Sequence, residues 1–133
     1  MEILNNLGID IIQKSLDAVW LRKETIANNI ANNDTPEYKS KYVVFEEQLK
    51  KALNKKSISK ETLQSKETLQ KEILNVDPEI IQNNNSTARE DGNNVDLDAE
   101  NIEMARAQLQ YEYLIRVLNS QMNIIKYALN GGN

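Results

Sequence analysis

The chain has 133 residues, which leaves room for one modest domain. Its formal net charge is −4 and its pI is near 4.9, so it lacks the positive charge that proteins use to neutralise nucleic-acid phosphates. Cysteine and histidine are both absent, which excludes disulfides, thiol nucleophiles, the usual zinc sites and the commonest general base. We therefore expect no enzyme activity, no catalytic residues, no cofactor, no metal and no nucleic-acid partner.

The first residues of the chain carry no basic segment followed by a continuous apolar run. A cleaved secretory signal is therefore not expected. Nowhere does the sequence approach the roughly 18 apolar residues that a membrane-spanning helix needs. We expect a soluble protein with no direct membrane span, and any export would use a route that cleaves no signal.

A heptad-like apolar seam predicts a long first helix, from about residue 5 to about residue 31. Apolar residues repeat at spacings of three and four, and Lys23 is the one interruption in this series. Trp20, Leu21 and Ala27 widen the apolar face beyond a narrow stripe. The seam comprises Ile9, Ile12, Leu16, Val19, Ile26 and Ile30.

Residues 28–39, with the sequence Asn-Asn-Ile-Ala-Asn-Asn-Asp-Thr-Pro-Glu-Tyr-Lys, end this helix. The side chains of Asn, Asp and Thr compete for backbone hydrogen bonds, and Pro lacks the N–H that a helix interior requires. After this break, Tyr42-Val43-Val44-Phe45 is β-branched and aromatic, and we predict a short extended segment. A short helix carrying Leu49 and Leu53 is then predicted over residues 46–56.

Residues 59–64 and 65–70 are identical copies of Ser-Lys-Glu-Thr-Leu-Gln. A period of six residues matches neither 3.5 nor 3.6, so a helix would carry the two leucines around its surface. We interpret the repeat as a variable, charged insertion that can form helix but need not be ordered. Residues 82–94 then form a polar loop, with a turn signal at Asp91-Gly92.

A second long helix is predicted from about residue 98 to about residue 130. Asp98 is the expected N-cap, Leu97 is placed to pack onto Ile102, and Gly131-Gly132 ends the helix. Its apolar face is too wide for one partner helix, so we expect other copies or other chains to cover the remainder. The main seam comprises Leu97, Met104, Ala107, Tyr111, Leu114, Leu118, Ile125 and Ala128.

The acidic, Asn-rich stretch that starts at Asp91 invites a comparison with a calcium-binding loop. An EF-hand requires an oxygen ligand at position 5, Gly at position 6 and Glu at position 12. This sequence has Val95, Asp96 and Ile102 at those positions. A turn followed by a helix cap is therefore the better interpretation.

Two blocks of the chain resemble the flagellar axial proteins, the family of rod and hook subunits. The first block resembles the N-terminal signature of that family and comprises Asn28, Asn29, Ile30, Ala31, Asn32, Thr35, Pro36, Tyr38 and Lys39. The second is similar to the stretch that marks one kind of basal-body rod protein and comprises Asp91, Gly92, Asn93, Asn94, Val95, Asp96, Leu97 and Asp98. The family usually has Gly after the Pro, where this chain has Glu37, so we expect a type I turn or a more extended path here.

The resemblance implies a structural subunit of the proximal rod of the bacterial flagellar basal body, which polymerises through helix packing and transmits torque. It implies export through the flagellar type III apparatus without signal cleavage, and assembly in the periplasmic space. The implied partners are further copies, other rod subunits, a FliE-type junction protein and the flagellar export gate. A cytoplasmic coiled-coil adaptor or export chaperone is the alternative, but it leaves the two blocks unexplained.

The predicted fold is mainly α, with two long terminal helices packed as an antiparallel, coiled-coil-like pair. Residues 1–33 and 95–133 form the paired domain, and residues 34–94 form an irregular middle with short extended and helical pieces. The packing seams are assigned to Ile12, Leu16, Val19, Ile26 and Ile30 in the first helix. In the second helix they are assigned to Tyr111, Leu114, Leu118 and Ile125.

Overall fold

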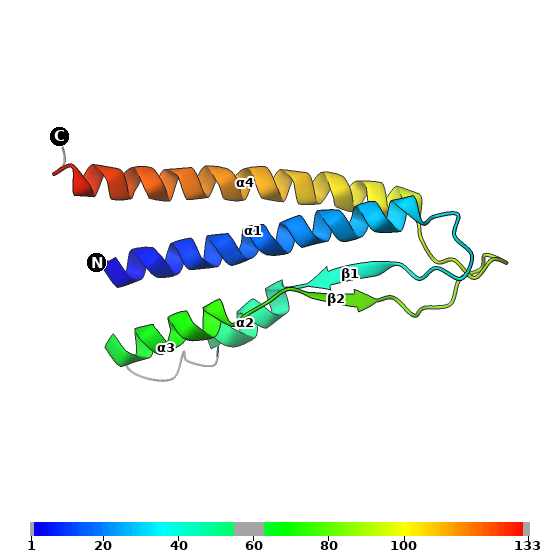
Figure 1. Cartoon of the computed structure of the whole chain (residues 1–133), viewed down its shortest axis with the longest axis horizontal. Helices are drawn as coiled ribbons and strands as arrows, with labels where there is room; N and C mark the ends of the chain where they lie inside the picture. The colour runs from blue at the N-terminus through cyan, green and yellow to red at the C-terminus, as the bar shows by residue number, and fades with distance from the viewer. Residues whose placement is uncertain (1, 55–62, 132–133) are drawn as a thin grey trace.

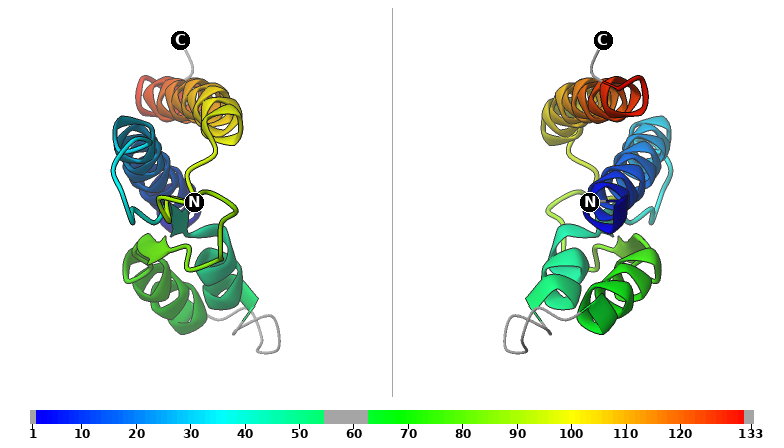
Figure 2. Two further views of the ribbon diagram at one scale, coloured as in Figure 1. Left: turned by 90° about the vertical axis from the view of Figure 1, so that its right-hand side faces the viewer. Right: turned by 90° about the vertical axis from the view of Figure 1, so that its left-hand side faces the viewer.

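The computed structural model describes residues 2–54 and 63–131, and its elements lie in three layers along one long axis (Figure 1). Helix α1 (Glu2–Ala31) forms the middle layer, and helix α4 (Leu97–Leu129) covers one side of it. The residues between these two helices form the third layer, on the other side of α1. The end-on views show the same order of layers (Figure 2).

The two long helices run antiparallel, so the chain ends lie together at one end of the molecule (Figure 1). Ala107 of α4 is 1% exposed and packs in one buried cluster with Val19 and Ile26 of α1. A small side chain at this position lets the two helices approach closely. Half-buried apolar side chains surround the cluster, namely Ile30, Met104, Tyr111 and Leu114. The predicted mainly α fold with an antiparallel terminal pair is confirmed.

The third layer, which we call the arm, is a two-stranded ribbon extended by two helices. Strand β1 (Lys41–Val44) pairs antiparallel with β2 (Glu79–Gln82), with Lys41 opposite Gln82 and Val44 opposite Glu79. Helices α2 (Glu46–Asn54) and α3 (Leu63–Leu74) lie beyond the ribbon and run back along α1 (Figure 1).

The arm has its own apolar core against the face of α1 that α4 leaves free. Ala18 of α1 packs there with Phe45, Ala52 and Val76, and Leu49 lies against this cluster. Two polar contacts also tie the arm to α1: Gln70 Nε2 donates to Asp10 Oδ2 at 2.6 Å, and Lys14 Nζ lies 2.7 Å from Asp77 Oδ1. Helix α1 is therefore covered along two faces.

The described part of the middle of the chain contains more regular secondary structure than the sequence predicts. The extended segment at 42–45 and the helix after it are observed as β1 and α2. Strand β2 was not predicted, because four residues are too few to show a period and only pairing with β1 defines them. Helix α3 contains the second copy of the hexapeptide, whereas residues 59–62 of the first copy and 55–56 of the predicted helix lie outside the described residues.

The start of α4 also differs from the prediction. Its N-cap is Asp96, not Asp98: Asp96 Oδ1 accepts from the backbone N–H groups of Asp98 and Ala99 at 3.0 and 3.1 Å. Leu97 therefore lies inside the helix and cannot serve as the residue that precedes the cap in a hydrophobic staple. At the other end Gly131 has a φ of 71°, as a glycine that ends a helix often does. Within the described residues, no helix is long and apolar enough to cross a membrane.

Candidate functional site: the loop junction

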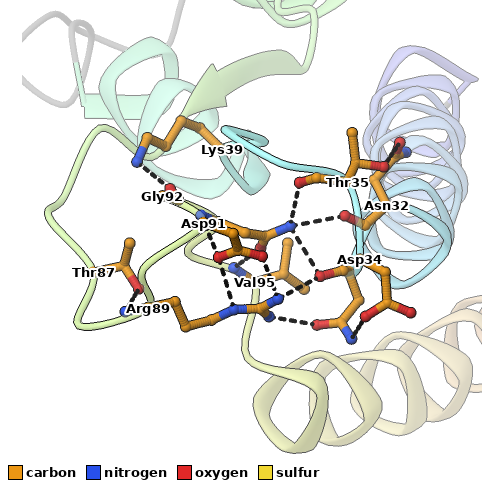
Figure 3. Close-up of polar contacts among 11 residues, drawn as sticks. Asn32, Asp34, Thr35, Lys39, Thr87, Arg89, Asp91, Gly92 and Val95 are labelled. Carbon is orange, nitrogen blue, oxygen red and sulfur yellow. Dashed lines mark hydrogen bonds and ion pairs between the residues drawn. The ribbon is translucent and has the colours of Figure 1, made fainter.

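Two segments distant in the sequence meet at the end of the molecule opposite the termini (Figure 1). Residues 32–40 leave α1, and residues 83–96 lead into α4; we call their contact the loop junction. Both blocks that resemble the axial proteins lie in or beside it. Figure 3 shows the hydrogen bonds that join residues 32–39 to residues 87–95.

Asn93 lies at the centre of the loop junction with none of its surface exposed. Its Nδ2 donates to the carbonyl oxygens of Asn32, Asn33 and Thr35 at 2.9, 3.0 and 2.9 Å. Its Oδ1 accepts from the backbone N–H of Val95 at 2.8 Å. One side chain thus binds three carbonyl groups of the turn that follows α1.

Asn29, also fully buried, makes a similar connection from the last turns of α1. Its Nδ2 donates to the carbonyl of Lys41 at 2.7 Å and to Glu100 Oε1 at 3.0 Å. Its Oδ1 accepts from the backbone N–H of Lys41 at 2.9 Å and from the Tyr38 hydroxyl at 3.2 Å. The amide of Asn29 therefore joins α1 to both the start of the arm and the first turn of α4.

The third asparagine, Asn94, holds the arm to the same junction. Its Oδ1 accepts from the backbone N–H of Ser40 at 2.7 Å, and its Nδ2 donates to the carbonyl of Asn83 at 2.8 Å. Lys39 Nζ also donates to the carbonyl of Gly92 at 2.6 Å. These bonds fix a single backbone path where three parts of the chain converge.

Arg89 closes the outer side of the loop junction. Its Nη2 lies 2.7 Å from Asp91 Oδ2 and donates to the carbonyl of Asn33 at 3.0 Å. The side-chain hydrogen bond from Arg89 is the main reason why the pKa of the Asp91 carboxyl is lowered, and the backbone N–H of Asn93 adds to it. Sequence reasoning missed Arg89, and its only signal was its position two residues before Asp91.

The backbone conformation of Glu37 shows that the predicted type I turn or extended path after Pro36 is wrong. Its φ is 61°, the left-handed region, and no other non-glycine residue in the described chain has a positive φ. The Glu37 N–H donates to the carbonyl of Asp91 at 2.8 Å, which holds it in this conformation. Gly92 faces it: a Cβ at Gly92 would lie 2.6 Å from Glu37 Oε1. The fold thus holds the backbone of a glutamate in the left-handed conformation that glycine adopts most easily.

We expect Glu37→Gly to raise the free energy of unfolding by about 0.5–1 kcal/mol. The left-handed conformation costs a non-glycine residue about 1–2 kcal/mol, which exceeds the entropy that a glycine adds to the unfolded chain. Urea unfolding followed by circular dichroism measures the change. Glu90→Gly, at an exposed position of the same junction without a positive φ, is the control and should destabilise. A loss of stability in both variants would contradict the strain at Glu37.

The polar contacts of Glu100 make the start of α4 sensitive to pH. Burial raises the pKa of the Glu100 carboxyl, the hydrogen bond from Asn29 opposes this, and the charges of Glu103 and Asp96 raise it further. The pKa of the Tyr38 hydroxyl is also raised, mainly by burial and then by the Glu100 charge. Because the folded pKa of Glu100 lies above the unfolded value, its protonated form favours folding and this contribution is lost as pH rises.

Glu100→Gln is therefore expected to be more stable than the parent chain at pH 7. A glutamine Oε1 still accepts from Asn29 and carries no charge to bury. The gain should shrink as pH falls through the raised pKa of Glu100 and should be lost by about pH 4, the ordinary range of a glutamate, because the parent carboxyl is then protonated as well. Urea unfolding at both pH values tests this. Asp98→Asn in the same helical turn is the matched control, and it should lose stability because it gives up a favourable charge at the helix N-terminus.

The remaining predicted assembly residues differ in their exposure to solvent. Asn28, Ala31 and Pro36 are exposed, Asn32 and Tyr38 are half-buried, and Val95 is buried. Thr35 is exposed, and its hydroxyl donates to Asn32 Oδ1 at 3.1 Å. Their role in assembly stays a prediction.

The seam residues divide by depth. Ile12, Val19 and Ile26 of α1 are buried. The other residues to which the packing seams are assigned are half-buried, namely Leu16, Ile30, Tyr111, Leu114, Leu118 and Ile125. In the wider predicted seam of α4, Ala107 is buried, whereas Leu97 and Ala128 are exposed. Because most of these seam side chains are only half-buried, the helix pair has apolar surface that the rest of the single chain does not cover.

Arg22 is a second residue that sequence reasoning missed. Its Nη1 donates to Gln110 Oε1 of α4 at 3.1 Å, and its Nη2 donates to both carboxylate oxygens of Glu46 at 2.8 Å. Burial opposes ionisation of Glu46, but the hydrogen bond and charge of Arg22 outweigh it and lower the pKa of this carboxyl. Arg22 thus connects all three layers near the middle of the molecule.

The chemistry of the loop junction is hydrogen bonding that fixes the backbone. In the described part of the chain, no three acidic side chains converge in a way that could hold a metal ion. An elongated helix pair, a short arm and a junction built from amides together define a mainly helical protein whose long helices leave large apolar side chains exposed. No family model matches the chain.

Individual relatives, however, match it over most of its length. It is 31% identical to the flagellar basal body rod protein FlgB of Bacillus subtilis, over 93% of this chain and 94% of the relative. It is 32% identical to FlgB of Borrelia hermsii, over 84% and 87%, and 30% identical to FlgB of Escherichia coli K12, over 91% of each. The chain belongs to the FlgB family of flagellar basal body rod proteins.

Proposed function

We propose that this chain is a structural subunit of the rod of the bacterial flagellar basal body. The observation that carries the proposal is the identity of 30–32% to rod proteins over more than four fifths of both sequences. The architecture supports it, because the helix pair leaves large apolar side chains of α4 exposed, as a subunit completed by its neighbours would. The comparisons give no support to a cytoplasmic adaptor or an export chaperone.

Within the rod, the chain occupies the proximal part and lies in the periplasmic space after export without signal cleavage. It associates with further copies, with other rod subunits, and at the base with a FliE-type junction protein and the export gate. Torque passes through a wall of packed helices, in which each α1–α4 pair supplies one stiff unit. The loop junction keeps that pair in register at one end.

A strain that lacks the gene tests the proposal directly. We expect it to be non-motile, with basal bodies that have no complete rod in electron micrographs, and we expect a plasmid copy to restore both. Immunoblots of purified basal bodies should contain the chain. Normal motility in the deletion strain, or a chain confined to the cytosol, would overturn the proposed function.

A point variant tests the role of the half-buried seam in the same strain. We expect Leu118→Asp to block incorporation into basal bodies, because it places a charge on the surface that neighbouring subunits cover. Asn119→Asp adds the same charge at the adjacent exposed position. We expect this variant to enter basal bodies in larger amounts than Leu118→Asp. Equal incorporation of both variants would refute the seam assignment.

A further inference from the structure

Asn130 is the one asparagine of the chain that is followed by a glycine. It is the C-cap of α4, with a φ of −83° and a ψ of 11°, and both Asn130 and Gly131 are exposed. This end of α4 lies at the end of the molecule opposite the loop junction (Figure 1). Within the described residues, no hydrogen bond holds the side-chain amide of Asn130, so this amide can rotate.

The backbone at Gly131 is weakly held. Its N–H donates to the carbonyl of Ala128 at 3.3 Å, which is long for a hydrogen bond between backbone groups. The terminal turn of a helix opens at little cost in free energy. Gly131 has a φ of 71°, and apart from its chain neighbours no atom lies within 4 Å of the position that a Cβ would take. The Asn130 side chain can therefore reach the Gly131 nitrogen.

We propose that Asn130 is a site of spontaneous deamidation, a property of the chain that does not depend on its proposed role in the rod. The Gly131 nitrogen gives up its proton and attacks Cγ of Asn130. A C–N bond forms, the bond between Cγ and Nδ2 breaks, and ammonia leaves, so that the product is a cyclic imide. Water then adds to either carbonyl carbon of the imide and opens the ring to aspartate or isoaspartate. The net reaction consumes one water and releases one ammonia, and nothing is oxidised or reduced.

The residue that follows an asparagine decides how easily the ring closes. A side chain at that residue shields its backbone nitrogen, whereas glycine has no Cβ and adopts more backbone conformations. Asn119 is also exposed and lies in the same helix, but Ser120 follows it. Its position in the interior of α4 means that helical hydrogen bonds fix the backbone on both sides. Asn119 is therefore a natural comparison for Asn130.

The loop junction contains a similar dipeptide, Asp91-Gly92, which the fold holds in place. Arg89 Nε and Nη2 donate to Asp91 Oδ1 and Oδ2 at 3.1 and 2.7 Å, and the N–H of Asn93 donates to Oδ1 at 3.1 Å. The carbonyl of Asp91 accepts from the N–H of Glu37 at 2.8 Å. The side chain of residue 91 cannot turn toward the Gly92 nitrogen unless these bonds break. The two dipeptides thus differ in how firmly the structure holds the reacting side chain.

Deamidation of Asn130 changes the charge and the backbone at the end of α4. The new carboxylate lies where the helix dipole is already negative, which is unfavourable. Lys126, the basic residue of the last turn, offsets part of this charge. Isoaspartate also routes the main chain through Cγ and so lengthens it by one carbon. We expect the last turn to loosen around Tyr127 and Leu129, which are 63% and 80% exposed.

Peptide mapping of the purified full chain, incubated at mildly alkaline pH, tests the proposal. Trypsin cleaves after Arg116 and Lys126, so separate peptides report on Asn119 and Asn130. We expect residue 130 to gain about 1 Da and to react with isoaspartyl methyltransferase. Its conversion should be about tenfold faster than that of Asn119, whose helical hydrogen bonds must open first. Equal rates at the two residues would overturn the proposal, as would no conversion at residue 130 while a synthetic peptide of residues 127–131 converts.

Two variants separate the chemistry from the local structure in the same assay. We expect Gly131→Ala to slow conversion of Asn130 about tenfold, because the methyl group shields the nitrogen. Alanine is strained at a φ of 71° and favours opening of the last turn, so a slower reaction cannot come from a firmer helix.

Asp91→Asn places the same dipeptide in the loop junction, where Arg89 and the N–H of Asn93 can still bind Oδ1. We expect residue 91 of this variant to convert about tenfold more slowly than Asn130 in the same chain. An unchanged rate in Gly131→Ala, or equal rates at residues 91 and 130 in Asp91→Asn, would contradict the proposal.

Discussion

Asn93→Asp is expected to lower the free energy of unfolding by about 3 kcal/mol. Aspartate has nearly the shape of asparagine but no N–H₂ group, so the carbonyls of Asn32, Asn33 and Thr35 lose their shared donor. Its carboxylate would also lie beside those three oxygens at a position without solvent exposure. Of the hydrogen bonds made by the side chain at position 93, only the one from the N–H of Val95 would persist. Urea unfolding followed by circular dichroism measures the loss.

Asn85→Asp is the matched control for this prediction. It makes the same chemical change eight residues away, at an exposed position in the segment that leads to α4. We expect its stability to stay within about 0.5 kcal/mol of the parent chain. Similar losses in the two variants would show that added charge, and not the lost donor, causes the effect.

The two long helices of this fold were predictable because each carries its own periodic signal, whereas α3 contains a hexapeptide whose period matches no helix. In α1, the spacing of Ile12, Val19 and Ile26 indicates one buried face, and these three side chains are indeed buried. The end of α1 follows from residue types that compete with helical hydrogen bonds. Local sequence therefore sufficed for the extent of α1 and α4, but not for the N-cap of α4, which is Asp96 and not Asp98.

The loop junction was predictable only as two separate blocks. Asn93 bonds to residues 58 to 61 positions earlier, and no local rule indicates which carbonyls it meets. Strand β2 depends in the same way on β1. Glu37 is the clearest case, because its residue type predicts a negative φ and the bond from its N–H to Asp91 imposes a positive one.

Ala107→Glu is expected to have the largest effect on the helix pair, a loss of more than about 3 kcal/mol. Position 107 is 1% exposed and packs against Val19 and Ile26, so a longer, charged side chain has neither space nor water. Ala105→Glu is the control: it lies two residues away, is exposed, and involves the same change in helix propensity. We expect it to change the stability by at most about 0.5 kcal/mol.

The damage from Ala107→Glu should be uneven, because α4 packs chiefly against α1 and the arm has its own core with Phe45, Ala52 and Val76. Hydrogen exchange should therefore accelerate more over residues 97–129 than over residues 41–54 and 63–82. Equal acceleration in both regions would show that the arm depends on α4.

The same pair of variants separates folding from assembly in cells. Ala107→Glu should be absent from basal bodies, since a detached α4 cannot present its outer surface to a neighbour. Ala105→Glu leaves the free chain folded, so its incorporation reports only on contacts that the exposed side of α4 makes with other subunits. A variant that is stable in solution and excluded from basal bodies would place such a contact near position 105. Normal incorporation would confine the contacts of α4 to other parts of its surface.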